Sequence, residues 1–85
     1  MGYSIEFSNR AAKDLLKLPS KIRVALGRSI EKLSVSQRPV GSQKLKGEDS
    51  LYRIRVGDYR IIYSVEDSKL VVLVVKIGHR REIYR

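Results

Sequence analysis

Arginine recurs at close spacing in the stretch YRIRVGDYR, residues 52–60, among residue types that favour β-strands. The residues VGDY at 56–59 predict a hairpin turn, because glycine beside aspartate tolerates the backbone angles of tight turns. Side chains alternate between the faces of a strand, so Arg53, Arg55 and Arg60 are expected on one face of this hairpin. Arginines grouped on a rigid sheet suit phosphate, because each guanidinium fork binds two phosphate oxygens.

The other face of the same hairpin is expected to be apolar. By alternation it carries Tyr52, Ile54, Val56, Tyr59, Ile61, Tyr63 and Val65. An apolar sheet face has to be buried against another layer of secondary structure, and the residues before the hairpin supply candidates for that layer. The cationic face is then expected to stay open.

A first strand and two helices are predicted before the hairpin. Residues 3–7 alternate weakly and predict a short strand. Ser8 or Asn9 can cap the first helix, which Pro19 ends, and Ser20 can cap the second helix. The apolar residues at helical spacing, all expected in the core, are Ala11, Leu15 and Leu18 in the first helix and Ile22, Ala25, Leu26, Ile30 and Leu33 in the second.

The second half of the chain predicts a sheet. Residues 34–50 are rich in proline, glycine and serine and predict a loop, and strands are expected at 51–56, 59–66 and 69–77. The last of these is apolar on both faces, which indicates a central or doubly covered strand. The predicted fold is α+β with the order βααβββ, a single domain over residues 1–85 in which a two-helix hairpin packs on one face of a twisted, mainly antiparallel sheet.

The charge balance indicates an acidic or polyanionic partner. The 85 residues include 18 Lys and Arg against 9 Asp and Glu, which gives a net charge of +9. Such an excess adds self-repulsion and most often serves nucleic acid, an acidic protein or a membrane surface, although it can also serve solubility alone.

Signals for export or membrane insertion are not found in the sequence. The opening residues MGYSIEFSNR lack the apolar core of a signal peptide, and the longest apolar run, residues 70–75, is far shorter than the about 20 residues that cross a bilayer. The chain has no cysteine, which excludes disulfides and thiolate zinc sites and suits a reducing compartment. A soluble, cytoplasmic protein without a membrane partner is expected.

The C-terminal residues GHRREIYR, 78–85, follow the last strand and can lie over the cationic face. They include two candidates for proton transfer. His79 is a residue type that changes charge near neutral pH, but continued alternation would direct it away from Arg80. The hydroxyl of Tyr84 is the other candidate, because neighbouring arginines favour the phenolate. The sequence leaves the identity of the general base open.

Other arrangements that support hydrolysis of nucleic acid are missing. The single histidine excludes a histidine acid–base pair, and no clustered carboxylates are available to hold two metal ions. Gly41 and Gly47 are isolated, so the chain has no glycine-rich phosphate loop. Neither a metal nor another cofactor is expected.

Four segments, in order and spacing, resemble the RelE branch of the RelE/ParE superfamily of toxins. They are KLKG at 44–47, LYRIRVGDYRIIY at 51–63, the valine-rich strand, and GHRREIY at 78–84. The resemblance implies a ribosome-dependent endoribonuclease that cuts mRNA in the ribosomal A site. It implies attack of the ribose 2′-hydroxyl on the neighbouring phosphate without a metal, and a RelB-like antitoxin protein that silences the toxin.

The resemblance also implies roles for individual residues. Its catalytic positions fall on Arg53, Arg55, Arg60, Arg80 and Tyr84, with contacts to RNA or ribosome expected from Lys44, Lys46, Arg81 and Arg85. Some relatives carry lysine where this chain has Arg53 and Arg55. Lysine can lose its proton in a cationic pocket and arginine essentially cannot, so a base has to come from elsewhere. Two alternatives are a ParE-type toxin that inhibits DNA gyrase and a basic nucleic-acid-binding module without catalysis.

Overall fold

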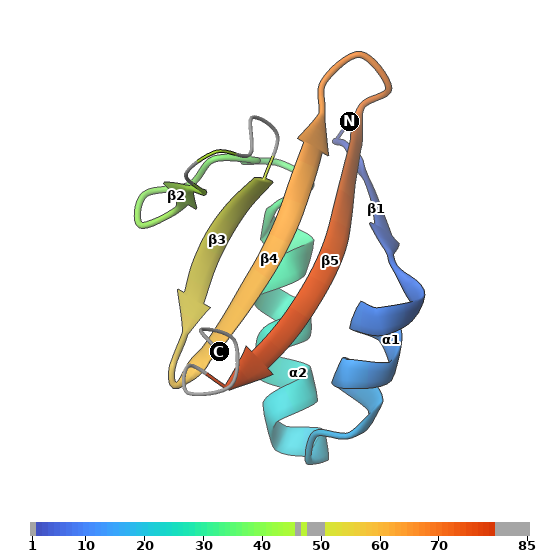
Figure 1. The fold of residues 1–85 in the computed structure, drawn as a ribbon, viewed down its shortest axis with the longest axis vertical. Coiled ribbons are helices and arrows are strands. Elements are labelled where there is room, and N and C mark those ends of the chain that lie inside the picture. The colour runs from blue at the N-terminus through green and yellow to red at the C-terminus, as the bar shows by residue number, and fades with distance from the viewer. Residues whose placement is uncertain (1, 46, 48–50, 80–85) are drawn as a thin grey trace.

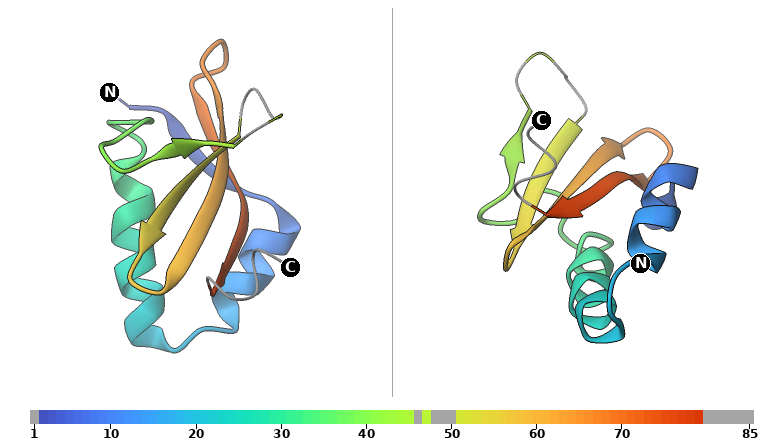
Figure 2. Two further views of the ribbon diagram at one scale, coloured as in Figure 1. Left: turned by 60° about the vertical axis from the view of Figure 1, so that its left-hand side comes forward. Right: turned by 60° about the horizontal axis from the view of Figure 1, so that its bottom comes forward.

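The fold is a two-layer α+β arrangement, seen in a computed structural model that describes residues 2–45, 47 and 51–79. Both helices lie on the same side of the sheet (Figures 1 and 2). The elements in chain order are β1 (Ser4–Phe7), α1 (Asn9–Leu16), α2 (Ser20–Lys32), β2 (Gln43–Lys44), β3 (Leu51–Val56), β4 (Tyr59–Glu66) and β5 (Val71–His79). No helix in the described part of the chain combines the length and apolar character needed to span a membrane.

Within the described residues the sheet has five strands, in the order β1-β5-β4-β3-β2. β1 pairs with β5 in parallel, and the other neighbouring pairs are antiparallel. The sheet twists strongly across its width (Figure 2). The predicted α+β class, the mainly antiparallel sheet and the helices on one face are therefore confirmed.

The predicted order βααβββ lacks one strand, and the bounds predicted for the last strand, 69–77, are wrong. The region 34–50, predicted as a loop, contains the short strand β2, in which Gln43 pairs with Arg53. A strand of two residues is too short to show alternation, because only its partner strand defines it. The last strand begins at Val71 rather than at residue 69, because Leu70 adopts a φ of 55° and the amide nitrogens of Lys69 and Leu70 close turns. A left-handed residue cannot continue an extended strand.

Strand β5 contains a bulge that changes which face its side chains occupy. Ile62 lies opposite Lys76, but the next residue of β4, Tyr63, lies opposite Val74, so Val75 is extra. Two side chains at α1 form hydrogen bonds with the backbone around the bulge. The hydroxyl of Ser8, the N-cap of α1, donates to the Val75 carbonyl oxygen at 2.8 Å, and an Asp14 carboxylate oxygen accepts from the Ile77 amide at 3.2 Å. Beyond the bulge, Ile77 is buried and Lys76 shares the face of Ile62.

The core lies between the helices and the apolar face of the sheet. The buried apolar residues are Ala11, Leu26, Ile30, Leu33, Ile54, Ile61, Tyr63, Val65, Val72, Val74 and Ile77. Tyr52, Val56 and Tyr59 are partly buried against them, so the prediction of an apolar face on the hairpin is confirmed. Ala25 was expected in the core but is exposed, because the apolar stripe of α2 is narrower than its sequence indicated.

The two predicted helix caps have different outcomes. The Ser8 hydroxyl accepts a hydrogen bond from the Ala11 amide at 3.0 Å, so Ser8 caps α1 as predicted. Ser20 does not cap α2. It is the first helical residue, and the N-cap is Pro19, which has no side chain that can bond to the helix.

Ser8→Ala is expected to lower the free energy of unfolding by about 1 kcal/mol, because the substitution leaves an amide of the first helical turn without its acceptor. Urea denaturation followed by circular dichroism measures the loss. Ser20→Ala is the matched control and is expected to change stability by less than about 0.5 kcal/mol, since Ser20 makes no cap bond. Equal losses in the two variants would contradict the assignment.

Candidate functional site

The arginines of the β3–β4 hairpin lie together on the sheet face opposite the helices. Arg55 lies directly across from Arg60, and Arg53 lies across from Ile62, so the parity predicted from the sequence is confirmed. Arg55 is exposed, Arg53 is half-buried and Arg60 is only 5% exposed. Like charges directly opposite each other on a sheet are normally destabilising. Their pairing here favours a role in binding an anion.

Strand β5 adds a further cation to this face. Lys76 lies opposite Ile62, which itself lies opposite Arg53, so the three side chains form one line across the sheet. Gly78 lies opposite Arg60 and places no side chain beside the guanidinium. Lys76 was not among the predicted site residues, because simple alternation fails across a bulge. A lone lysine within a valine-rich strand was the available signal. Arg55 and Arg60 lie on a second line across the same face. The four residues of these two lines, Arg53, Arg55, Arg60 and Lys76, are called the cationic row below.

A hollow of about 310 Å³ lies beside the cationic row. It is lined by Val40, Gly41, Gln43, Arg53, Ile54 and Arg55. The side-chain oxygen of Gln43 accepts a hydrogen bond from the Arg53 guanidinium, and Gln43 is also the residue that pairs with Arg53 in the sheet. Gln43 was not among the predicted site residues, because its proximity to Arg53 depends on the unpredicted strand β2.

Lys44 is not brought together with the arginines. It lies opposite Tyr52, whose side chain faces the helices, so the register places Lys44 on the other face of the sheet from Arg53. The other predicted positions, Lys46, Arg80, Arg81, Tyr84 and Arg85, lie outside the described residues.

His79 lies on the helix side of the sheet. It is paired with Tyr59, and the two rings meet edge to face with centroids 5.5 Å apart. The same two side chains contribute to a second hollow, of about 460 Å³, with residues of α1 and the segment after it. His79 is therefore separated by the sheet from Arg60, whose side chain occupies the opposite face.

The cationic row can bind an anion and stabilise negative charge that grows on it. Fixed positive donors are most effective where charge develops during a reaction, because they do not have to reorganise. Arginine stays protonated in proteins, so Arg53, Arg55 and Arg60 supply hydrogen bonds and charge without accepting a proton. A phosphate or a carboxylate is the kind of anion that such an arrangement fits, because both present two oxygens to a guanidinium fork.

Comparisons with known proteins identify the family. The family model for the ParE toxin of the type II toxin–antitoxin system parDE matches residues 5–84. The chain is 35% identical to the mRNA interferase toxin RelE of Escherichia coli (strain K12), over 99% of this chain and 92% of the relative. It is 31% identical to toxin RelG of Mycobacterium tuberculosis, over 100% of this chain and 99% of that toxin.

Solved structures agree with this assignment. The RelE–RelB complex of the archaeon Pyrococcus horikoshii OT3 contains a chain that matches with a TM-score of 0.84 and 30% identity, covering 96% of this chain and 99% of that one. The isolated RelE toxin of Escherichia coli matches with a TM-score of 0.82 and 35% identity, over 96% and 90% of the two chains. The chain therefore belongs to the RelE/ParE family of toxins from type II toxin–antitoxin systems.

Proposed function

We propose that this chain is a RelE-type toxin, an endoribonuclease that inhibits translation by cutting mRNA in the ribosomal A site. The observation that carries the proposal is the buried Arg60 directly opposite Arg55 on the sheet face that the helices leave open. The proposal is supported by relatives named mRNA interferase that align with nearly the whole chain.

The proposed reaction is a transfer within the RNA. The ribose 2′-hydroxyl loses its proton and attacks the adjacent phosphorus, the bond from phosphorus to the 5′ oxygen breaks, and the leaving oxygen gains a proton. The products are a 2′,3′-cyclic phosphate and a free 5′-hydroxyl. The nucleophile comes from the substrate, so the protein has to hold the phosphate and stabilise the negative charge of the transition state.

Roles can be proposed for the individual residues. Arg60 and Arg55 bind the scissile phosphate, and Arg53 and Lys76 bind the neighbouring backbone. Arg80 is proposed as a further phosphate donor, and Tyr84 is proposed to stack on a base or assist proton transfer. Contacts to RNA or ribosome outside the reacting group are proposed for Lys44, Lys46, Arg81 and Arg85, with Lys44 acting from the other face of the sheet.

An antitoxin is the proposed protein partner. Several similar structures are RelB–RelE antitoxin–toxin complexes, including those from Pyrococcus horikoshii and Escherichia coli. A RelB-like protein with an acidic or amphipathic segment would complement the net charge of +9 on this chain. Such a segment would keep RNA away from the cationic row if it lay directly on that row.

The two alternatives have less support. The family model that matches is that of the ParE toxin, but the toxins in the similar curated relatives and solved structures named above are of the Rel type. The cationic row is also suited to a reacting phosphate, which inhibition of gyrase by binding alone does not require. A nucleic-acid-binding module without catalysis would use the same row, and only activity separates it from the proposal.

Mapping of mRNA 5′ ends after brief expression tests the proposed function. New ends that carry a 5′-hydroxyl are expected inside translated codons, and Arg60→Ala is expected to reduce them to background because it removes a phosphate donor. Lys69→Ala is the control with unchanged cleavage. Lys69 lies in the β4–β5 turn, where its ammonium is 3.4 Å from the Glu66 carboxylate.

The alternatives give different results in the same experiment. Growth arrest without new 5′ ends would support a gyrase-directed toxin. A folded protein that binds RNA, leaves growth unaffected and creates no new ends would be a binding module. Either result would reject the nuclease.

A further inference from the structure

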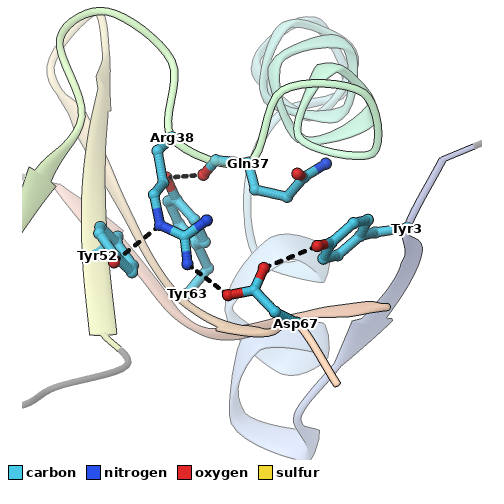
Figure 3. A network of polar contacts seen from close by, with 6 residues as sticks. All are labelled: Tyr3, Gln37, Arg38, Tyr52, Tyr63 and Asp67. Carbon is cyan, nitrogen blue, oxygen red and sulfur yellow. Dashed lines mark hydrogen bonds and ion pairs between the residues drawn. The ribbon is translucent and has the colours of Figure 1, made fainter. Parts of the chain in front are cut away.

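Arg38 joins the loop between α2 and β2 to two distant parts of the sheet (Figure 3). One terminal nitrogen of its guanidinium donates to an Asp67 carboxylate oxygen at 2.9 Å, and its Nε donates to the Tyr52 hydroxyl oxygen at 2.9 Å. The Tyr3 hydroxyl donates to the other Asp67 oxygen at 2.7 Å. Tyr3, Arg38, Tyr52 and Asp67, called the Arg38 latch below, thus connect this loop with the chain before β1, with β3 and with the β4–β5 turn.

The residue next to Arg38 is anchored independently. The hydroxyl of Tyr63, which is fully buried, donates to the Gln37 carbonyl oxygen at 2.8 Å. The Tyr63 ring stacks on the ring of Tyr52 with centroids 5.8 Å apart, and the Arg38 guanidinium lies 5.1 Å from the Tyr52 centroid. The loop is therefore held at two consecutive residues by groups attached to the sheet (Figure 3).

The same loop forms one wall of the hollow beside the cationic row. Val40, Gly41 and Gln43 line that hollow across from Arg53 and Arg55. A turn in which the Ser42 amide donates to the Pro39 carbonyl oxygen at 2.9 Å connects the latch to this wall. The segment is thus fixed at one end by Arg38 and at the other by the pairing of Gln43 with Arg53.

We propose that Arg38 is a positioning residue: the Arg38 latch holds the 39–43 wall in place, and through Gln43 it fixes the orientation of Arg53 for phosphate binding. The expected effect on RNA cleavage rests on the proposed function. The positioning of residues 39–43 and Arg53 by the latch does not, because it concerns the free protein. Arg38 does not line the hollow, so its effect on a bound phosphate would be indirect.

The latch is closed at neutral pH. The hydrogen bond from Arg38, followed by that from Tyr3, holds the pKa of the Asp67 carboxyl below its usual value. The bond to Asp67 raises the pKa of the Tyr3 hydroxyl, and it also raises that of Arg38. Because the pKa of Asp67 is lowered, the ion pair between Asp67 and Arg38 is fully formed at any pH above the usual pKa of aspartate. It is lost only as the pH falls through the lowered value.

The first test follows the loop in the free protein by nuclear magnetic resonance. Asp67→Asn changes the β4–β5 turn and leaves the sequence of the loop intact. Asp67 contacts the loop through Arg38 and also through Tyr3, which bonds to Ser34, so a change that is shared with Arg38→Ala is assigned to Arg38. The amide signals of Gly41 and Gln43 and the Nε–H signal of Arg53 are expected to shift and broaden. Arg38→Ala is expected to shift the same signals. Lys69→Ala, which breaks the ion pair between Lys69 and Glu66 near this turn, is expected to leave them unchanged.

The second test measures cleavage of ribosome-bound mRNA. Asp67→Asn is expected to lower kcat/KM about tenfold, because a displaced Arg53 holds the RNA backbone beside the scissile phosphate less precisely. The thermal unfolding midpoint is expected to change little, since exposed ion pairs contribute little to stability. In the Arg53→Ala background, Asp67→Asn is expected to have almost no further effect on the rate.

The outcomes separate this inference from the proposed function. Unchanged signals of Gly41, Gln43 and Arg53 in Asp67→Asn overturn the inference, whether or not the parent protein cuts RNA. An equal loss of rate in the parent and Arg53→Ala backgrounds also overturns it, because the latch would then not act through Arg53. A parent protein that cuts no RNA rejects the proposed function, while the first test still decides whether the latch positions the loop.

Discussion

The purified protein is expected to cut mRNA on the ribosome and to leave the same naked transcript almost untouched, with rates that differ by roughly a thousandfold or more. The cationic row can grip a phosphate and stabilise its charge. It does not by itself force a flexible RNA into the in-line geometry that attack by the 2′-hydroxyl requires. Orientation can contribute roughly 7 to 11 kcal/mol to a barrier, and a ribosome that holds the A-site codon is the proposed source of much of it.

Cleavage of one transcript, free and in a programmed ribosome, provides the measurement. Toxin that has been stripped with EDTA and desalted is expected to cut ribosome-bound mRNA at an unchanged rate, because the proposed reaction uses no metal held by the protein. The Arg60→Ala protein at the same concentration controls for contaminating nuclease. Equal cutting of free and ribosome-bound RNA would contradict the dependence on the ribosome.

Arg60→Ala is expected to slow cleavage on the order of a hundredfold or more, the usual effect of removing one fixed donor to a transition-state charge. Arg60 is only 5% exposed, so water screens its positive charge weakly. The attraction between its guanidinium and a bound phosphate is correspondingly strong. Single-turnover cleavage of ribosome-bound mRNA measures the rate of the chemical step.

Two matched substitutions separate chemistry from folding. Arg60→Met keeps much of the apolar volume and removes the charge opposite Arg55, so the variant is expected to be folded yet inactive. Arg60→Lys keeps the charge but loses the two-pronged fork, and an intermediate rate is expected. Thermal unfolding monitors the fold of each variant. A fully active Arg60→Met protein would show that the buried guanidinium is not needed for catalysis.

The central hairpin could be predicted from the sequence because its determinants are local. Gly57 adopts a φ of 59° at the turn, and alternation on either side places Ile54 in the core and Arg55 in solvent. No distant contact is needed to reach that result. The same local signals correctly gave Ser8 as a helix cap.

The features of the site that were missed depend on contacts between distant residues. β2 exists only because Gln43 reaches Arg53, and Lys76 occupies the cationic row only because the bulge at Val75 changes the parity of β5. The burial of Arg60 likewise cannot be read from alternation, which assigns a face but not the depth of a side chain. The roles of Arg80 and Tyr84 stay predictions, since both lie outside the described residues.

The pairing of Arg55 with Arg60 has a consequence for how folding and binding are linked. Folding the hairpin brings two like charges to opposite positions on adjacent strands, so part of the stability gained by burying its apolar face is offset. An anion that binds only the folded sheet shifts the folding equilibrium in favour of the native state, by an amount that grows with its concentration relative to its dissociation constant. RNA phosphates and partner carboxylates would therefore compete for the position that stabilises the toxin itself.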